Sequence, residues 1–148
     1  MQGAVKLELE RIRQQDGGFL NPHRVVEIAR SPENPLHEHF EWDDTEAAER
    51  YRLAQARALI RVAVIVNEKK DYNPVRAYVS LTTDRYNQRG YRAMVDIVND
   101  EVLVETMLKD AIMELQSFQR KYNKLRDVAS LSPVFEALEG IASKEGAA

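Results

Sequence analysis

The sequence has no cysteine and no long hydrophobic run. Without cysteine, the chain has no disulfide bond, no thiolate nucleophile and no thiolate ligand for zinc. Its longest apolar run covers only residues 62–66, whereas a transmembrane helix needs about 20 apolar residues. The first residues also lack the apolar stretch of a signal peptide. We therefore expect a cytoplasmic protein without a membrane partner.

Common signatures of catalysis are missing as well. The sequence contains no glycine-rich phosphate loop, no G-x-S-x-G nucleophile elbow and no H-E-x-x-H zinc motif. Nothing in the pattern singles out one pair of carboxylates for acid/base work. We predict that the protein is not an enzyme and that it uses no cofactor.

The length and net charge of the chain limit the number of domains and the extent of any basic surface. The chain has 148 residues, of which 44% are hydrophobic and 30% are charged. This length suits one domain, and the composition is ordinary for a globular protein. We predict a single domain over residues 1–148, made of a helical segment (1–61), a β-meander (60–98) and C-terminal helices (99–144). The net charge is −3, so any strongly basic surface must be local.

Two helices are predicted near the N-terminus. The first ends at Gly17 and Gly18, because a glycine pair after the last turn stops a helix. The second begins with Asn21 as its N-cap and Pro22 at its first position. The order of helix, glycine turn and helix occurs in helix-turn-helix units, but it occurs in any other helical hairpin too.

A polar cluster precedes the next predicted helix. Residues 37–44 hold two histidines, two glutamates, a tryptophan and two aspartates. A His-x-His pair on a strand can bind zinc, but it needs a third ligand, and His23 is the only other histidine. We interpret the acidic residues as a helix start, with Asp43 as N-cap and Glu46 completing a capping box. We predict no metal site.

The helix predicted after this cluster has apolar residues on one face and arginines on another. Its apolar residues fall on one side, and Arg50, Arg57 and Arg61 form a stripe on another. Before it, Phe40 and Trp42 are expected to pin the polar loop to the core.

Residues 60–98 change to the pattern of strands. Three segments rich in β-branched and aromatic residues are separated by turn residues: IRVAVIV, PVRAYVSLT and GYRAMVDIV. In the second segment, apolar residues from Val75 to Leu81 alternate with Arg76, Tyr78 and Ser80. Such alternation predicts strands with one buried face, and short connections favour antiparallel order. We expect a three-stranded antiparallel β-meander.

A long helix is predicted after Asn99. Its apolar residues are spaced by four and three residues in turn: Val104, Leu108, Ala111, Leu115, Phe118, Tyr122, Leu125 and Ala129. This repeat is typical of helices that pack side by side, and it also suits a helix on the sheet of its own chain. We expect the helix to cover the sheet, and a short last helix to follow it. The seam Leu108, Leu115, Phe118, Tyr122 and Leu125 would also join copies of the chain.

These patterns together predict an α+β fold. The expected order is N-terminal helices, a three-stranded antiparallel β-meander, and a long C-terminal helix packed on the sheet.

The charge of the chain is unevenly distributed. Residues 61–92 contain seven basic and three acidic groups, a local charge of +4, so the remainder carries −7. Tyrosines are interleaved with these bases, and cations beside aromatic rings are what sheets and loops use to bind nucleic acids. The candidate residues are Lys69, Lys70, Arg76, Tyr78, Arg85, Tyr86, Arg89 and Arg92. The same charges also fit a solvated sheet face or a protein-binding face.

Four strings carry a resemblance to known proteins: LERIRQQDGGFLNPHRVVEIAR, PLHEHFEWDDTEAAERYRLAQAR, PVRAYVSL and LQSFQRKY. Through them the chain, over about residues 7–128, resembles a group of small uncharacterised proteins of tailed phages and prophages. The resemblance implies a phage-borne accessory protein in a bacterial cytoplasm, and it implies no catalytic residue.

The sequence thus predicts a non-enzymatic phage accessory protein that self-associates and binds DNA or RNA through its basic sheet and loops. The main alternative is an interaction protein, either a virion component or an inhibitor of a host factor, that meets a phage or host protein and binds no nucleic acid. A small hydrolase using the polar cluster at residues 37–44 is a third hypothesis.

Overall fold

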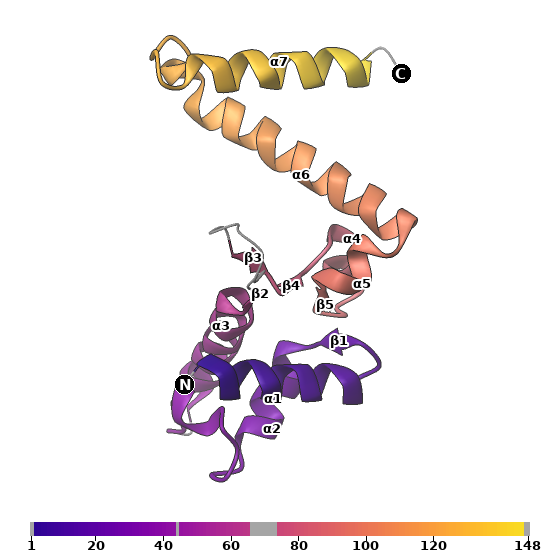
Figure 1. Cartoon of the computed structure of the whole chain (residues 1–148). Coiled ribbons are helices and arrows are strands. Elements are labelled where there is room, and N and C mark those ends of the chain that lie inside the picture. The colour runs from indigo at the N-terminus through magenta and orange to yellow at the C-terminus, as the bar shows by residue number, and fades with distance from the viewer. Residues whose placement is uncertain (1, 44, 66–73, 147–148) are drawn as a thin grey trace. The chain divides into compact units, whose positions relative to one another are not determined.

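The fold is α+β, as the sequence predicts, with helices, small antiparallel sheets and a long C-terminal helix (Figure 1). The computed structural model describes residues 2–43, 45–65 and 74–146. It consists of two compact units, Met1–Val104 and Glu105–Ala148, whereas the sequence divides a single domain at residues 61 and 99. The two units are described separately below.

The first unit begins with helices α1 (Gln2–Gln15), α2 (Pro22–Ala29) and α3 (Glu46–Val62), with strand β1 (Phe19–Leu20) and the 3-10 helix η1 (His37–His39) between them. It continues with β2 (Val64–Ile65), β3 (Val75–Arg76), β4 (Tyr78–Val79), α4 (Thr82–Tyr86), β5 (Tyr91–Ala93) and α5 (Met94–Val98). The last helices are α6 (Glu101–Tyr122), which begins in the first unit, η2 (Asn123–Leu125) and α7 (Ser132–Gly146).

The first two helices have the ends that the sequence predicts. Gly17 and Gly18 follow α1 with φ angles of 66° and 95°, a left-handed conformation that glycine adopts without a steric penalty. At the start of α2, the Asn21 side chain accepts a hydrogen bond from the backbone N–H of His23, and Pro22 occupies the first turn. These predictions are confirmed.

The start of α3 differs from the predicted capping box. Thr45, not Asp43, is the N-cap: its hydroxyl accepts a hydrogen bond from the backbone N–H of Ala48. Glu46 is then the first helical residue, and its carboxylate lies near the positive end of the helix dipole. The prediction was two residues early, because threonine and aspartate both serve as N-caps. Asp44 lies outside the described residues.

The sheet is not the predicted meander. Its order is β1-β5-β4, so a strand from the N-terminal segment pairs antiparallel with β5, and Phe19 lies opposite Arg92. A separate antiparallel pair joins β2 to β3. The chain leaves one sheet after Arg76 and enters the other at Tyr78, so the predicted second strand is two short strands.

Two further parts of the predicted meander are helical. Residues 82–86, expected as the end of the second strand and the start of a turn, form α4, and the second half of the predicted third strand forms α5. In α5, Ile97 is buried while Val95 and Val98 are exposed. A run of β-branched residues alternates on a strand, but on a helix the same run spreads around the axis.

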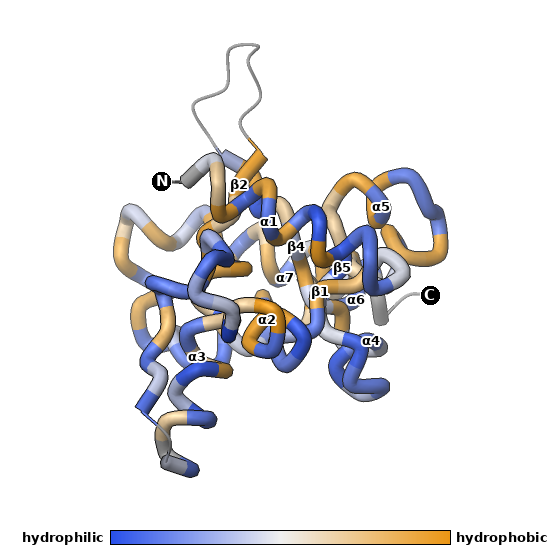
Figure 2. Tube along the Cα trace, turned by 90° about the horizontal axis from the view of Figure 1, so that it is seen from below, coloured by the Kyte–Doolittle hydropathy of each residue, from blue (hydrophilic) through white to orange (hydrophobic). Residues whose placement is uncertain are grey.

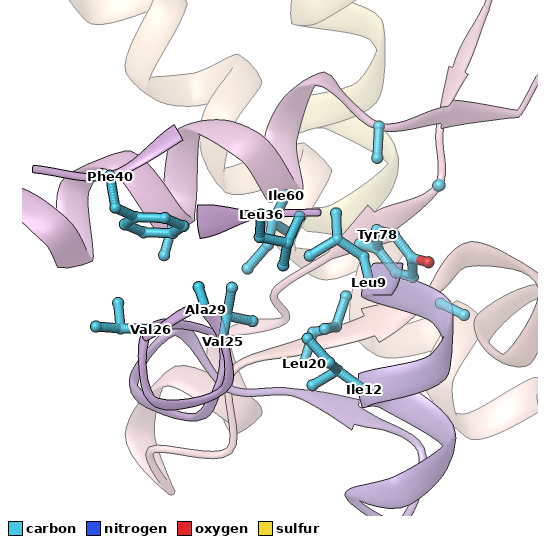
Figure 3. Close-up of a cluster of buried hydrophobic side chains, with 14 residues drawn as sticks. Leu9, Ile12, Leu20, Val25, Val26, Ala29, Leu36, Phe40, Ile60 and Tyr78 are labelled. Carbon is cyan, nitrogen blue, oxygen red and sulfur yellow. The ribbon is translucent and has the colours of Figure 1, made fainter. Parts of the chain in front are cut away.

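The N-terminal helices cover the buried side of the first unit's sheet (Figure 3). Leu9 and Ile12 of α1 and Ile60 of α3 are fully buried. They lie in the same core as Leu20, the strand residues Tyr78 and Ala93, and Ala77 between β3 and β4. The sequence analysis expected the long C-terminal helix to cover the apolar face of the sheet. In the first unit, residues of the N-terminal helices pack in one core with the strand residues. Burial of this apolar surface supplies the main free energy that holds the unit together.

In the second unit, α6 ends at Tyr122, and η2 interrupts the predicted seam before Leu125. Across α6, all of whose residues the structure describes, no side chain is buried. Phe118 contacts Phe135 of α7, with ring centroids 5.9 Å apart, and Arg126 forms an ion pair with Glu139.

Among the described helices, none is long and apolar enough to cross a membrane.

Candidate nucleic-acid interface

The predicted basic residues do not form one surface. Lys69 and Lys70 lie outside the described residues. Arg76 is exposed on β3, in the two-stranded sheet. The other predicted residues lie on β4, on β5 and on the segment between them.

Tyr78 is the clearest correction. Its side chain is 2% exposed, and its hydroxyl donates a hydrogen bond of 3.0 Å to the Glu10 carboxylate on α1. Burial and this hydrogen bond raise the pKa of the Tyr78 hydroxyl. The strand alternation placed Tyr78 beside Arg76 on an open face, but the change of sheet at Ala77 turns it into the core. Tyr78 is therefore not a nucleic-acid-binding residue.

Arg92 is also engaged within the protein. Its guanidinium donates two hydrogen bonds, of 2.6 and 2.8 Å, to the Asp84 carboxylate, which is 1% exposed. It also lies over the Phe19 ring, 4.7 Å from the centroid. A buried carboxylate needs such a partner, so Arg92 has a structural role and is removed from the binding surface.

Residues 80–92, here called the basic loop, are held by contacts at both ends. The Ser80 hydroxyl donates to the Gly90 carbonyl (2.7 Å), and the Arg89 backbone N–H donates to the Asp84 carbonyl (2.9 Å). Gly90 has a φ of 96° and lies directly against the Leu20 backbone, where a Cβ atom would overlap the carbonyl group. Only glycine fits such a close approach. The loop therefore has a defined shape.

Within the basic loop, Gln88 adopts a φ of 55°. A non-glycine residue in this left-handed region costs free energy, and such residues cluster at functional sites. The Gln88 carbonyl accepts a hydrogen bond of 3.4 Å from the Asn21 side chain, which ties the loop to the start of α2.

The basic loop presents three residues of the predicted set outward: Arg85, Tyr86 and Arg89. The Tyr86 side chain is 89% exposed. The Arg85 guanidinium hydrogen-bonds the Ser80 carbonyl and the Thr82 hydroxyl, and the exposed Arg89 lies over Phe19 at 5.8 Å. Figure 2 shows α4 as an almost entirely hydrophilic part of the chain. Because Asp84 and Arg92 neutralise each other, the loop carries a net charge of +2.

This arrangement combines three elements of nucleic-acid binding. A flat exposed ring offers a stacking surface for a base, and guanidinium groups donate to phosphate oxygens. A rigid loop loses little conformational entropy when it binds. The contribution of Phe19 was missed from the sequence, because nothing in its surroundings indicated that β1 pairs with β5.

The polar cluster around residues 37–44 packs around Trp42. The His37 ring stacks on the indole at 4.9 Å, and its Nδ1 lies 2.9 Å from the Ala29 carbonyl. The Trp42 Nε1–H donates to the His37 carbonyl, and the guanidinium groups of Arg30 and Arg52 lie over the ring. Among the described residues, no group of three histidine or carboxylate side chains is placed to hold a metal ion.

The predicted seam lies on the second unit. Leu108, Leu115 and Tyr122 are exposed on one face of α6, and Leu125 is exposed on η2. Phe118 of the same seam contacts Tyr122 on α6 and Phe135 on α7.

Comparison with known proteins adds no relative. No protein-family model matches the chain, and no curated protein or solved structure is significantly similar to it.

Proposed function

We propose that this protein binds nucleic acid through the basic loop, without catalysing a reaction, and that it self-associates through α6. The observation that carries the proposal is Tyr86, whose ring is 89% exposed between Arg85 and Arg89 on a loop of defined shape. An exposed tyrosine contributes little burial to the fold, and its ring between two arginines supports a role in binding a ligand.

The charge of the loop favours a polyanion as that ligand. Arg85 and Arg89 each carry a guanidinium charge at the surface of the loop, and guanidinium groups bind phosphate oxygens well. The ring of Tyr86 offers a surface on which a nucleic-acid base can stack. A small inorganic anion has no ring to stack there, so the tyrosine favours a nucleic acid as the ligand. Arg76, exposed on the neighbouring strand pair, adds a further positive charge to the first unit.

Self-association is supported by the second unit. The apolar residues Leu108 and Leu115 are exposed on α6, and exposed apolar rows on a helix commonly pack against a partner helix. Phe135 and Leu138 are the buried hydrophobic residues among those described in this unit. So small a core stabilises a helical hairpin poorly without a partner. A second copy of the chain supplies an identical row.

A phage setting is proposed from sequence resemblance alone. The strings that resemble small proteins of tailed phages and prophages run from α1 to the end of α6. In that setting the protein acts in the cytoplasm of a bacterial host, where nucleic acids are available as polyanions.

The proposal is tested by fluorescence anisotropy with labelled single-stranded DNA, duplex DNA and RNA. The variants Arg85→Gln/Arg89→Gln and Tyr86→Ala are expected to weaken binding. Loss of one stacked base costs about 1–3 kcal/mol, so Tyr86→Ala should raise Kd at least about fivefold. The two arginine changes should raise it further at low salt.

A matched control changes two arginines elsewhere. Arg11 is exposed on α1 and Arg24 is partly exposed on α2, and each forms an ion pair with a glutamate three residues away. The variant Arg11→Gln/Arg24→Gln removes the same charge and should change Kd less than about threefold. If the loop variants bind as the control does, the basic loop is not the binding surface. If a protein partner is captured instead and no nucleic acid binds, the protein-interaction alternative replaces this proposal.

A further inference from the structure

We propose that α3 is a second contact surface and that the ligand is duplex DNA, with the arginine stripe of α3 lying along the major groove. This inference rests on the proposed nucleic-acid binding and specifies its substrate class. It is carried by Arg50, Arg57 and Arg61, which lie outside the basic loop.

The three arginines form a narrow row. At 3.6 residues per turn, they fall within about 40° of one another around the helix axis, and at ~1.5 Å per residue they span about 16 Å along it. All three are exposed, as are Ala54 and Ala58 beside them. The small alanine side chains let the helix approach a large partner closely, while the arginines extend beyond them.

The arginines of the row have no carboxylate partner in the described part of the chain. Two acids lie in the first turn of α3. Glu46 is four residues before Arg50 but forms no ion pair with it among the described contacts, and Glu49 is engaged by Arg30 and by the buried Arg52. From residue 50 to residue 62 the helix contains four arginines and no acidic residue. Exposed arginines on helices are commonly paired by acids three or four residues away, as Arg11 and Arg24 are in this chain.

Helix stabilisation explains only part of this pattern. Cations interact favourably with the helix dipole within the last turn, and Arg61 is the basic residue of that turn in α3. Arg50 and Arg57 lie farther from the C-terminal end. No carboxylate among the described residues pairs with either arginine, which favours an external anion of extended shape as their partner.

Duplex DNA fits this row better than other nucleic acids. An α-helix with its side chains is about 10–12 Å across, and the major groove of B-form DNA is about 12 Å wide. The major groove of an RNA duplex is too deep and narrow for side chains to read. Single strands are bound mainly by rows of aromatic rings, whereas the aromatic residue on the exposed face of α3 is Tyr51 alone. With duplex DNA as the ligand, the ring of Tyr86 would stack on an unpaired base at a duplex end or on a base of an opened pair.

The test compares the log–log salt dependence of binding to a labelled 20-base-pair DNA duplex. The variant Arg57→Gln/Arg61→Gln should flatten the slope by about 1.8, because each lost phosphate contact contributes about 0.9. The variant Arg57→Lys/Arg61→Lys keeps the charges and should restore the slope. The control Arg11→Gln/Arg24→Gln should leave the slope unchanged. All variants should keep the melting temperature of the wild type within a few degrees, since exposed positions contribute little to stability.

The outcomes separate this inference from the proposed function. If Arg57→Gln/Arg61→Gln binds as the control does while Arg85→Gln/Arg89→Gln is weakened, the α3 inference is wrong and the proposed function stands. If the wild type binds an RNA duplex of the same sequence as tightly as DNA, the choice of duplex DNA is wrong. If the wild type binds none of these probes at 50 mM salt, both proposals fail together.

Discussion

Arg92 of β5 and Asp84 of α4 form a two-hydrogen-bond ion pair that closes the basic loop on itself. The distances are 2.6 and 2.8 Å, and the carboxylate is almost completely buried. The pair explains why one of the predicted binding arginines is withdrawn from solvent. It also fixes the loop so that Arg85, Tyr86 and Arg89 project from a defined backbone.

Removing the carboxylate should destabilise the first unit. In Asp84→Asn, the charge of Arg92 loses its partner, and breaking such a pair costs about 3 kcal/mol. Urea unfolding measures the change in the free energy of unfolding. The control Glu8→Gln weakens the more exposed pair with Arg11 and should cost less than about 1 kcal/mol. Equal effects of the two changes would mean that the Asp84 pair does not hold the loop.

Gly90 should tolerate no side chain. In Gly90→Ala the new Cβ overlaps the Leu20 carbonyl, and the positive φ adds backbone strain. We expect a loss of more than about 2 kcal/mol, because the steric overlap adds to a strain of about 1–2 kcal/mol. Gly17→Ala is the control, since Gly17 also has a positive φ but has open space around it. Thermal melting of both variants checks the difference, and a smaller effect at Gly90 than at Gly17 would contradict the described loop packing.

The hydrogen bond between Tyr78 and Glu10 predicts a specific pH dependence. Burial raises the folded-state pKa of the Tyr78 hydroxyl above its ordinary value of 10.0. The folded state therefore holds this proton more tightly than the unfolded state. Its contribution to stability is complete below pH 10 and is lost as the pH rises towards the folded-state pKa.

Tyr78→Phe should therefore flatten the fall in stability above pH 10, and it should cost about 1–2 kcal/mol at neutral pH through the lost hydrogen bond. Tyr86→Phe is the matched control, because that side chain is exposed and its change should alter neither quantity. Unfolding in urea at several pH values measures both. A Tyr78→Phe protein with the alkaline profile of the wild type would show that the hydroxyl is not buried.

The N-terminal helices could be predicted from sequence because their signals are local. The glycine pair at residues 17–18, the cap at Asn21 and the adjacent proline each act within one turn of the chain. The strands could not be predicted equally well. They are two or three residues long, so they are shorter than the alternation that identifies a strand. The pairing of β1 with β5 joins residues more than 70 positions apart in the sequence, and no local sequence pattern predicts this pairing.

The candidate site shows the same limit. All of the candidate binding residues were selected for their charge or aromatic character, Tyr78 and Arg92 included. Arg85, Tyr86 and Arg89 are exposed, as expected for a loop between turn signals. The engagement of Tyr78 and Arg92 depends on Glu10 and Asp84, and nothing in the sequence pattern revealed that these two carboxylates are their partners.

Self-association is tested by two substitutions on opposite sides of α6. Leu108 and Met113 are both 57% exposed, and Leu108 belongs to the predicted seam whereas Met113 lies on the far side of the helix. Leu108→Asp should shift the mass measured by light scattering towards the monomer, because it places a charge in an apolar interface. Met113→Asp should not change the mass. A wild-type protein that is monomeric at tens of micromolar would rule out the seam as an interface.

The most direct test of the proposed function is the salt dependence of wild-type binding to a DNA duplex. Contacts from Arg85 and Arg89 of the basic loop alone should give a log–log slope of about −1.8, at about −0.9 per phosphate. Between 50 and 200 mM salt, this slope corresponds to a loss of affinity of about 12-fold. The added contacts of α3 would make the slope steeper. Binding that does not change over this range, or no binding at 50 mM salt, would contradict nucleic-acid recognition by this protein.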